Sequence, residues 1–163
     1  MKETMLICGA DGFIGKTALE YFKDRYSITA VLFNKDVSPR GTTEGVEYVS
    51  ADLRVESEVI DLFEMKRYDI VLQLAATTTG AKDVVERPYV HVTDNSVMNS
   101  WIFREAMRTK VGHLLFPSCT VMYQPKSHPQ SESDWSPLDE IYPAYFGVGN
   151  MKVFCEKMCD FYS

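Results

Sequence analysis

The sequence lacks an excess of positive charge, and it lacks any long apolar run. Its 17 lysine and arginine residues are outnumbered by 23 aspartate and glutamate residues, which gives a net charge of −6. A surface that follows nucleic-acid phosphates needs the opposite sign, so we expect no nucleic-acid partner. No stretch approaches the ~20 apolar residues of a membrane span, and no signal peptide precedes the first apolar segment. We therefore expect neither a membrane partner nor a secretory leader.

Cysteine is scarce, and its spacing is not that of a metal site. The four cysteines are Cys8, Cys119, Cys155 and Cys159, without a CxxC pair or a matching histidine pattern. Cys155 and Cys159 lie one helical turn apart, which is better explained by buried or half-buried thiols than by zinc. We expect no metal ion, and a reducing, cytoplasmic location follows as the default.

An apolar run near the N-terminus stops at a glycine that two further glycines follow. The run is Met5–Cys8, and the glycines are Gly9, Gly12 and Gly15. In a strand–turn–helix unit, the first glycine takes a φ that other residues avoid. The second lets backbone N–H groups approach a diphosphate, and the third lets the helix pack close to the strand. The positive end of the helix dipole then faces the phosphates. The pattern predicts a dinucleotide site, against the alternative of a structural glycine turn.

Strand and helix patterns alternate along the chain, whose 163 residues fit one domain. The expected strands are residues 4–8, 28–33, 46–50, 70–74 and 113–117. The expected helices are 13–24, 56–65, about 88–110 and about 147–161, with loops over 34–45, 77–88 and 124–141. This alternation implies a parallel sheet with ligands at the carboxyl ends of its strands. We predict an α/β fold, a doubly wound Rossmann-type domain over residues 1–163 with helices on both faces.

Five segments, in order, match motifs of one known family. They are Cys8–Gly15 for the turn TGxxGFIG, Ala51–Leu53 for the DL pair, Leu72–Ala76 for HLAA, Asp94–Val97 for the asparagine segment, and Ser118–Tyr123 for SSxxVYG. Through them the chain resembles the extended short-chain dehydrogenase/reductases, the nucleotide-sugar epimerase/dehydratase family. The likeness covers essentially the whole chain, with Cys8 in place of the usual threonine and Gln73 in place of the histidine.

The resemblance implies a set of cofactor-binding residues. They are Gly9, Gly12, Phe13, Ile14, Gly15, Asn34, Lys35, Asp52, Leu53, Ala75, Ala76, Thr77, Asn95 and Lys152. In the family the carboxylate at Asp52 holds the adenine amino group, and Leu72–Ala76 runs beside the diphosphate and ribose. Alternatives stay open at this point: Asp52 as the N-cap of the next helix, the two alanines as close-packing residues, and Asn95 as a solvated helix residue.

The end of the second expected strand bears on the choice between NAD and NADP. NAD enzymes usually place an acid there to bind the ribose 2′-hydroxyl. This strand ends in Phe33-Asn34-Lys35-Asp36, with Arg40 nearby. Asn34 and Lys35 suit a 2′-phosphate, whereas Asp36 suits NAD, and the balance leans slightly to NADP.

The family's chemistry begins with hydride transfer between a substrate carbon and the nicotinamide. A tyrosine phenolate moves the hydroxyl proton, and a lysine one helical turn later lowers the tyrosine pKa from about 10 and binds the nicotinamide ribose. Lys152 and Glu156 match the family's YGxSKxxxE, but the tyrosine position falls on Val148. The nearest phenol, Tyr145, lies ~10 Å from Lys152 along a continuous helix, unless glycines at the helix start make it irregular. A solvated lysine and a packing aromatic are the alternatives for Lys152 and Tyr145.

The position of the family's serine is altered too. Counting back from Tyr123 places it on Cys119, with Ser118 and Thr120 as neighbours. On a strand, Ser118 and Thr120 share one side and Cys119 faces the other. We favour Thr120 or Ser118 for the hydroxyl role and keep Cys119 as the aligned position, against the alternative of hydroxyls that cap backbone groups. The candidate catalytic residues are Ser118, Cys119, Thr120, Tyr145 and Lys152.

Family members are considerably longer, and their later part holds the nucleotide-sugar substrate. The resemblance therefore implies the cofactor half of a nucleotide-sugar-modifying oxidoreductase or isomerase, which binds NAD(P) but is inactive alone. A homodimer is the family's expectation. The alternative, which Val148 suggests, is a non-catalytic NAD(P)-binding regulatory or sensor protein of the same fold.

Overall fold

The computed structural model describes residues 2–33, 43–78 and 80–163. The chain divides into two compact units. Unit 1 consists of Met1–Ala76 and Met98–Pro117, and unit 2 of Thr77–Val97 and Ser118–Ser163. The expectation of one cofactor-binding domain over the whole chain stays a prediction.

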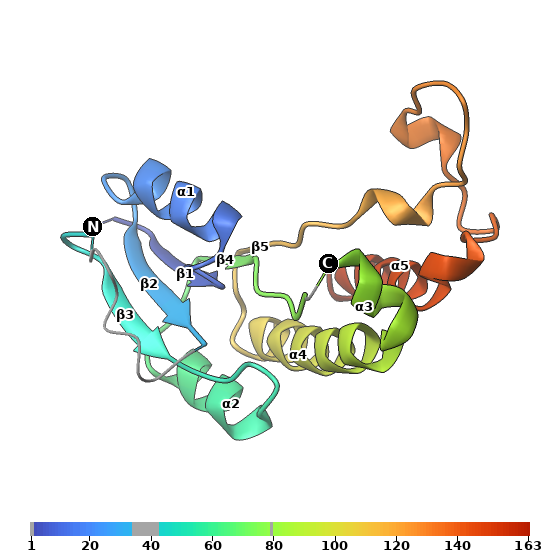
Figure 1. Cartoon of the computed structure of the whole chain (residues 1–163). Helices are drawn as coiled ribbons and strands as arrows, with labels where there is room; N and C mark the ends of the chain where they lie inside the picture. Colours follow the sequence, from blue (N-terminus) through green and yellow to red (C-terminus); the bar gives the residue numbers. More distant parts are fainter. Residues whose placement is uncertain (1, 34–42, 79) are drawn as a thin grey trace. The chain divides into compact units, whose positions relative to one another are not determined.

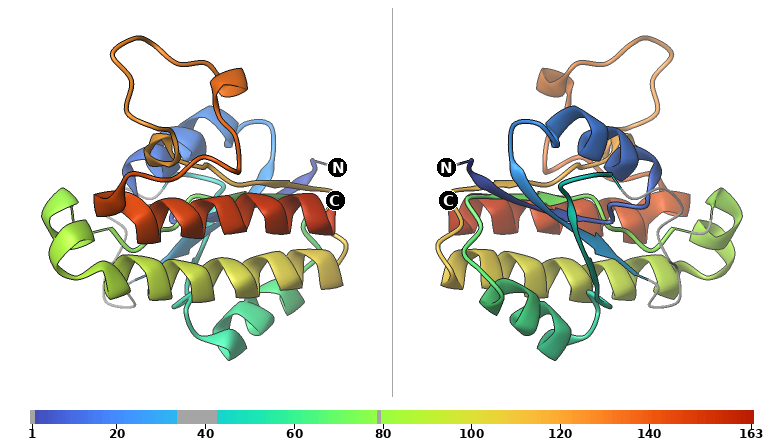
Figure 2. Two further views of the ribbon diagram at one scale, coloured as in Figure 1. Left: turned by 90° about the vertical axis from the view of Figure 1, so that its right-hand side faces the viewer. Right: turned by 90° about the vertical axis from the view of Figure 1, so that its left-hand side faces the viewer.

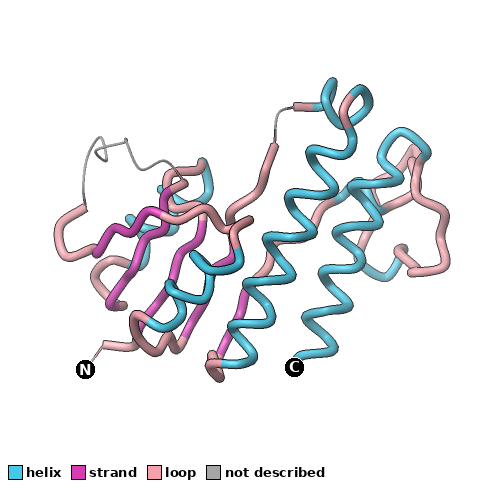
Figure 3. The backbone as a smooth tube through the Cα atoms, turned by 90° about the horizontal axis from the view of Figure 1, so that it is seen from below, coloured by secondary structure: helices cyan, strands magenta, loops and turns pink. Residues whose placement is uncertain are grey.

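A parallel sheet forms the centre of unit 1. The described residues give it five strands in the order β3-β2-β1-β4-β5 (Figure 3). They are β1 (Thr4–Cys8), β2 (Ser27–Leu32), β3 (Glu47–Ser50), β4 (Ile70–Gln73) and β5 (His113–Leu115). All neighbouring pairs are parallel. The strand order reverses between β1 and β4, and ligands bind doubly wound sheets beyond the carboxyl ends at such a point.

Helices cover both faces of this sheet, as Figure 1 shows for α1 (Phe13–Phe22) and α2 (Glu56–Glu64). Successive strand side chains point to opposite faces. Met5 and Ile7 of β1 belong to one buried cluster with Leu19 of α1. The other face is covered by α2 and the second half of α4 (Pro88–Arg108), which bury apolar residues such as Leu62 and Ile102. The prediction of an α/β, Rossmann-type fold with helices on both faces is confirmed.

Unit 2 holds α3 (Ala81–Glu86), the first half of α4, and α5 (Phe146–Tyr162), which Figure 2 shows as one unbroken helix. Three single 3₁₀ turns accompany them, at Thr120–Met122, Glu132–Asp134 and Pro143–Tyr145. The expected loop over 77–88 is wrong where α3 lies. This helix follows Gly80, whose φ is +100°, and an ion pair of 2.6 Å joins Asp83 to Arg87 across its last turn.

The fifth strand is shorter than the spacing of apolar residues predicted. The expectation was 113–117, but β5 ends at Leu115. Pro117 has no backbone N–H to donate to the sheet, and proline also disfavours regular conformations at the residue before it. The chain therefore leaves the sheet before Ser118, which changes how the following polar residues are presented.

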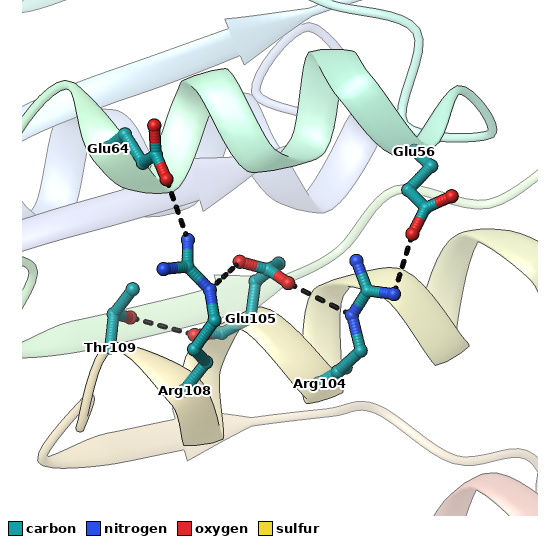
Figure 4. A network of polar contacts seen from close by, with 6 residues as sticks. All are labelled: Glu56, Glu64, Arg104, Glu105, Arg108 and Thr109. Atoms are coloured by element: carbon teal, nitrogen blue, oxygen red, sulfur yellow. Dashed lines mark hydrogen bonds and ion pairs between the residues drawn. The ribbon is translucent and has the colours of Figure 1, made fainter.

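One carboxylate is buried in unit 1 between two arginines of α4 (Figure 4). The side chain of Glu105 is only 1% exposed, and it accepts hydrogen bonds from Nε of Arg104 at 2.9 Å and from Nε of Arg108 at 2.5 Å. The same guanidinium groups reach α2, where Arg104 pairs with Glu56 at 2.7 Å and Arg108 with Glu64 at 3.3 Å. The network thus ties the second half of α4 to α2.

Replacing the buried carboxylate should destabilise the protein. We expect Glu105→Ala to lower the free energy of unfolding by about 2–3 kcal/mol, because it removes two hydrogen bonds between charged groups and leaves a cavity where the buried carboxylate lay. This expected loss is smaller than the roughly 3–5 kcal/mol that breaking a fully buried ion pair costs, because both arginines are partly exposed. Urea unfolding measures the change, with Glu64→Ala as the control, since an exposed ion pair contributes little. Equal losses in the two variants would contradict the assigned role of Glu105.

Candidate functional site

The glycine turn that joins β1 to α1 leaves no room for side chains at two positions. Gly9 has a φ of +73°, and a Cβ there would lie 2.7 Å from Cα of Ala75. A Cβ at Gly15 would lie 2.2 Å from the carbonyl oxygen of Gly9. The backbone geometry expected for these two glycines is therefore present. Their role toward a cofactor stays a prediction.

The start of α1 offers free amide groups to an anion. This helix begins after Gly12, and no side chain of the described residues caps it. The first N–H groups of a helix have no partner within the helix, and with the helix dipole they favour a negative charge. Phe13 and Ile14 are largely exposed at this end. The residues present fit a dinucleotide diphosphate, because bare glycine backbone and uncapped amides lie together.

The segment at the end of β4 lies against this turn, and the buried side-chain amides of Gln73 and Asn99 hold it in place. The side chain of Gln73 is buried, and its Nε2 donates to Oδ1 of Asn99 at 2.9 Å and to the carbonyl of Ala75 at 3.2 Å. Gln73, in the place of the family's histidine, thereby positions the backbone of Ala75, which contacts Gly9. Ala76 follows directly.

Asp52 follows β3 at the same edge of the sheet. Ala51 donates its N–H to the carbonyl of Leu32 at 3.0 Å, which holds this segment beside the end of β2. The N-cap of α2 is Val55, so the interpretation of Asp52 as that N-cap is wrong. The neighbouring Leu53 is 5% exposed and packs as a core residue.

Both oxygens of the Asp52 carboxylate bind Arg54. Oδ1 accepts from the backbone N–H and from Nε of Arg54 at 3.0 and 2.9 Å, and Oδ2 accepts from Nη2 at 2.8 Å. The guanidinium carbon lies 5.0 Å from the ring centre of Phe33. Arg54 was not among the residues expected here, and its only signal in the sequence is a cation two positions after Asp52. Asn34, Lys35, Asp36 and Arg40 lie outside the described residues.

In unit 2, Asn95 of α4 holds the backbone of Thr77. Its Oδ1 accepts the Thr77 N–H at 2.9 Å, and its Nδ2 donates to the carbonyl of Thr77 at 3.0 Å and to that of His91 at 2.6 Å. Asn95 is buried, so the interpretation as a solvated helix residue is wrong. The clamp fixes the segment that follows β4 along the chain.

The segment after β5 does not present Ser118 and Thr120 on one face of a strand. Cys119 is extended, with φ −145° and ψ 158°, but Thr120 already begins a 3₁₀ turn. The strand alternation expected for these residues is therefore wrong, because the strand ends at Leu115. The assignment of the hydroxyl role to Ser118 or Thr120 stays a prediction.

Cys119 and Lys152 are neighbours in unit 2 and act on each other electrostatically. Burial raises the pKa of the Cys119 thiol, against the amide N–H of Val121 and the Lys152 ammonium, which lower it. Burial lowers the pKa of Lys152, and the nearby Cys119, Cys155 and Glu156 oppose that shift. Lys152 is therefore not a solvated helix lysine, and that alternative is wrong.

The start of α5 is regular, which leaves Tyr145 away from Lys152 along the chain. The helix runs from Phe146 through both glycines. A Cβ at Gly147 would lie 2.9 Å from Cγ2 of Val92, and one at Gly149 would lie 2.8 Å from Cγ2 of Ile141. These glycines permit close packing, so the expected irregularity does not occur. Tyr145 ends the preceding 3₁₀ turn, with its ring centre 6.1 Å from that of Tyr142.

Metal-ligating side chains do not gather in the part of the chain that the structure describes. There, no three His, Cys, Asp or Glu side chains lie where they could share a metal ion. All four cysteines, each of them described, are free thiols. Among the described helices, none combines the length and the apolarity needed to cross a membrane.

Comparison with known proteins gives one family and many similar folds. Residues 5–159 match the model of the NAD dependent epimerase/dehydratase family. The UDP-glucose 4-epimerase of Thermotoga maritima, solved with UDP-glucose, is 18% identical with a TM-score of 0.80 over 98% of this chain and 50% of its own. That of Thermus thermophilus, in complex with NAD, is 22% identical with a TM-score of 0.80 over 98% and 50%.

A third solved structure extends the same likeness. The UDP-Glc/GlcNAc 4-epimerase of Campylobacter jejuni is 23% identical with a TM-score of 0.81, over 99% of this chain and 49% of its own. The chain thus spans about half the length of these solved relatives. Among curated proteins, no significant sequence match is found.

The burial of Lys152 predicts a pH-dependent stability. Because the folded state disfavours the ammonium, the folded-state pKa is below the ordinary lysine value of about 10.4. Below that lowered pKa the wild-type protein carries the full penalty, which disappears as the pH rises toward the ordinary value. Lys152→Met should therefore unfold at a higher urea concentration than wild type at neutral pH, and the difference between their urea midpoints should shrink at alkaline pH.

Lys157→Met is the matched control, since Lys157 lies exposed on the same helix. It should change the urea midpoint little at any pH. A Lys152→Met variant that is less stable than wild type at neutral pH, by an amount independent of pH, would contradict the penalty.

Proposed function

Because this chain belongs to the NAD dependent epimerase/dehydratase family, we propose that it binds a nicotinamide dinucleotide at the glycine turn of unit 1. The observation that carries this proposal is the uncapped start of α1 behind Gly9 and Gly15, where a Cβ would collide with backbone. Amides at the start of α1 hold the diphosphate, with Gly12 leaving space for it. Once bound, the nicotinamide accepts or returns a hydride.

The family resemblance assigns further cofactor-binding roles to residues at the strand ends of unit 1 and, separately, to residues of unit 2. Phe13 and Ile14 flank the diphosphate at the start of α1, and Ala75 and Ala76 line its other side. Asp52 and Leu53 border the adenosine end. In unit 2, Thr77 and Asn95 continue the segment after β4, and Lys152 serves the nicotinamide ribose. The close approach of Ala75 to Gly9 and the clamp on Thr77 support these roles.

For the reaction, we infer a nucleotide-sugar as the substrate class. The support is that the solved relatives are UDP-sugar epimerases, one of them solved with UDP-glucose. Ser118, Cys119 and Thr120 are the candidates for a hydrogen bond to the reacting sugar oxygen, and Tyr145 is the nearest phenol before Lys152 in the sequence. Since the chain spans about half the length of its solved relatives, we propose that it binds the cofactor without turning over the sugar alone. From the family resemblance, we also propose a homodimer.

Titration calorimetry of this chain tests cofactor binding. Wild-type protein should bind a nicotinamide dinucleotide, and Gly12→Ala should weaken that binding about tenfold or more while the fold is retained. A Cβ at Gly12 would lie 3.2 Å from the Gly9 carbonyl, a contact that a small shift relieves, but the methyl group would stand where the diphosphate approaches.

Gly112→Ala is the matched control, because its Cβ would meet the carbonyl of Asp69 at 3.1 Å just before β5, at the amino edge of the sheet. It should leave affinity unchanged. A folded wild-type chain that binds neither NAD nor NADP would refute the proposed function. Turnover of a nucleotide-sugar by this chain would refute its proposed inactivity.

A second function, a non-catalytic NAD(P)-binding regulator or sensor, is favoured by one observation. Val148 lies one helical turn before Lys152 on α5, on the same face, where the family has its tyrosine. Valine has no proton to transfer. The partly buried Lys152 is retained. A catalytic site would still let this lysine lower the pKa of a phenol placed at position 148, whereas a regulator need not.

The variant Val148→Tyr separates these two functions. In a catalytic environment the introduced phenol should titrate below the ordinary value of about 10, because the Lys152 ammonium stabilises the phenolate. Difference absorbance titration against wild type measures it, and Val148→Tyr combined with Lys152→Met is the control that should abolish the shift. A phenol that titrates normally would favour the regulator.

A further inference from the structure

Two buried amide side chains meet inside unit 1, in the apolar layer between the sheet and α4. Gln73 ends β4 and is 1% exposed, and Asn99 of α4 is 2% exposed. Both residues belong to unit 1, and Nε2 of Gln73 donates to Oδ1 of Asn99 at 2.9 Å. Their neighbours on the same face of the sheet are apolar and fully buried. Cys8 lies opposite Gln73 in β1, and Val71 lies two residues earlier in β4.

This amide pair leaves one polar atom unsatisfied. In the described part of the chain, Oε1 of Gln73 has no hydrogen-bond partner, although it is buried. Rotating the amide by half a turn would not help, because Oε1 would then face the carbonyl oxygen of Ala75, which is also an acceptor. A buried acceptor without a partner lowers the stability of the folded state. An apolar pair of similar volume would avoid this cost, so the stability of unit 1 does not explain the two amides.

The Gln73 amide has a second proton, which it donates to the segment that continues β4. At the end of the described ladder between β1 and β4, the N–H of Leu74 donates to the carbonyl of Cys8 at 3.1 Å. The carbonyl of Ala75 lies one residue further along the chain and accepts from Nε2 of Gln73 at 3.2 Å. The Gln73 side chain therefore holds backbone that lies just beyond the ladder.

Ala75 is also the residue that lies against the glycine turn. A Cβ at Gly9 would lie 2.7 Å from Cα and 2.8 Å from N of Ala75, so the two backbones are in direct contact. The same turn leads through Gly12 to the uncapped first amides of α1, which are the proposed ligands of the diphosphate. A binding site keeps its affinity only while its groups stay within about 0.5 Å of the productive geometry. A shift of Ala75 would therefore reach the proposed anion site through Gly9.

We propose that the Gln73–Asn99 pair is a positioning device of the dinucleotide site, which fixes Ala75 against Gly9 at a cost in stability. The inference rests on the proposed dinucleotide binding. It goes beyond that function because it assigns a share of the affinity to two side chains that are almost inaccessible to a ligand. Replacing the pair by apolar residues should then weaken binding without weakening the fold.

Titration calorimetry with NAD+ and NADP+, together with urea unfolding, tests the proposal on the 163-residue chain. The variant Gln73→Met combined with Asn99→Leu removes both amides and retains most of their volume. Its urea midpoint should equal or exceed that of wild type, because an apolar pair costs little in place of a buried hydrogen bond and the unpaired oxygen is gone. Its affinity for the dinucleotide that wild type binds more tightly should fall about fivefold or more, because Ala75 loses its hydrogen bond.

Gln73→His is the rescue variant. An imidazole N–H can donate to the carbonyl of Ala75, so the affinity should stay within about twofold of wild type whatever the urea midpoint does. A loss of affinity as large as that of the apolar variant would contradict the role assigned to the donor.

Thr29→Val is the matched control, because Thr29 is also a buried polar residue on this face of the sheet. Thr29 lies opposite Leu6 of β1, two residues before Cys8, and its hydroxyl donates to Oε2 of Glu47 at 3.0 Å. It does not contact the segment after β4. This variant should leave the dinucleotide affinity unchanged, whatever its effect on the urea midpoint.

Three further results would overturn the proposal. A folded apolar variant that binds the dinucleotide as tightly as wild type would show that the pair does not position the site. A clear fall in the urea midpoint of that variant would show that the pair stabilises the fold. A folded wild type that binds neither cofactor would refute the proposed function together with this inference, whereas the first two results leave the proposed function intact.

Discussion

The contact between bare backbone segments at Gly9 and Gly15 is the constraint on which unit 1 depends. The carbonyl of Gly9 lies where the Cβ of any other residue at position 15 would be, and Ala75 lies where a Cβ at position 9 would be. The turn after β1, the start of α1 and the end of β4 can therefore meet only without side chains. Because these segments meet, helix amides and strand ends share one edge of the sheet, and the proposed cofactor contacts of unit 1 follow from that edge.

Two acidic residues of unit 1 form ion pairs with arginine in different surroundings. Glu105 is buried, and its two arginines reach across to α2, so its contribution is to join two helices. Asp52 lies partly exposed after β3, and its arginine is held over an exposed ring. In the first case the arginines neutralise a carboxylate in the interior, whereas in the second the ion pair lies near the surface.

The fold was predictable because its signals are local. Apolar runs of strand length and helical periodicity located all five strands and the helices α1, α2, α4 and α5, with errors of a few residues at their ends. The short α3 was missed because its six residues are too few to show a helical periodicity of apolar residues. The early end of β5 depends on Pro117, whose effect the favourable apolar run before it conceals.

The candidate site was predictable only where glycine and motif spacing define backbone. The close approaches at Gly9 and Gly15 belong to this class. The roles of Glu105 and Arg54 depend on side chains that meet across the fold, such as Arg104 with Glu56 and Arg54 with Phe33, and no local pattern reports such pairs. The expectation of an irregular helix near Tyr145 was wrong for the same reason. The two glycines of α5 allow Val92 and Ile141 to pack closely against the helix, and this contact is not visible in the local sequence.

The buried thiols have a consequence for following the motions of this protein. Cys8 lies fully buried in β1 of unit 1, and Cys155 lies fully buried in α5 of unit 2. Burial raises the pKa of these thiols to about 12 and about 11, so neither forms the reactive thiolate in the native state. An alkylating reagent can then reach each one only after its surroundings open. Each unit therefore contains one fully buried thiol whose rate of alkylation reports local opening. Comparing the two rates would reveal whether the two units open together or independently.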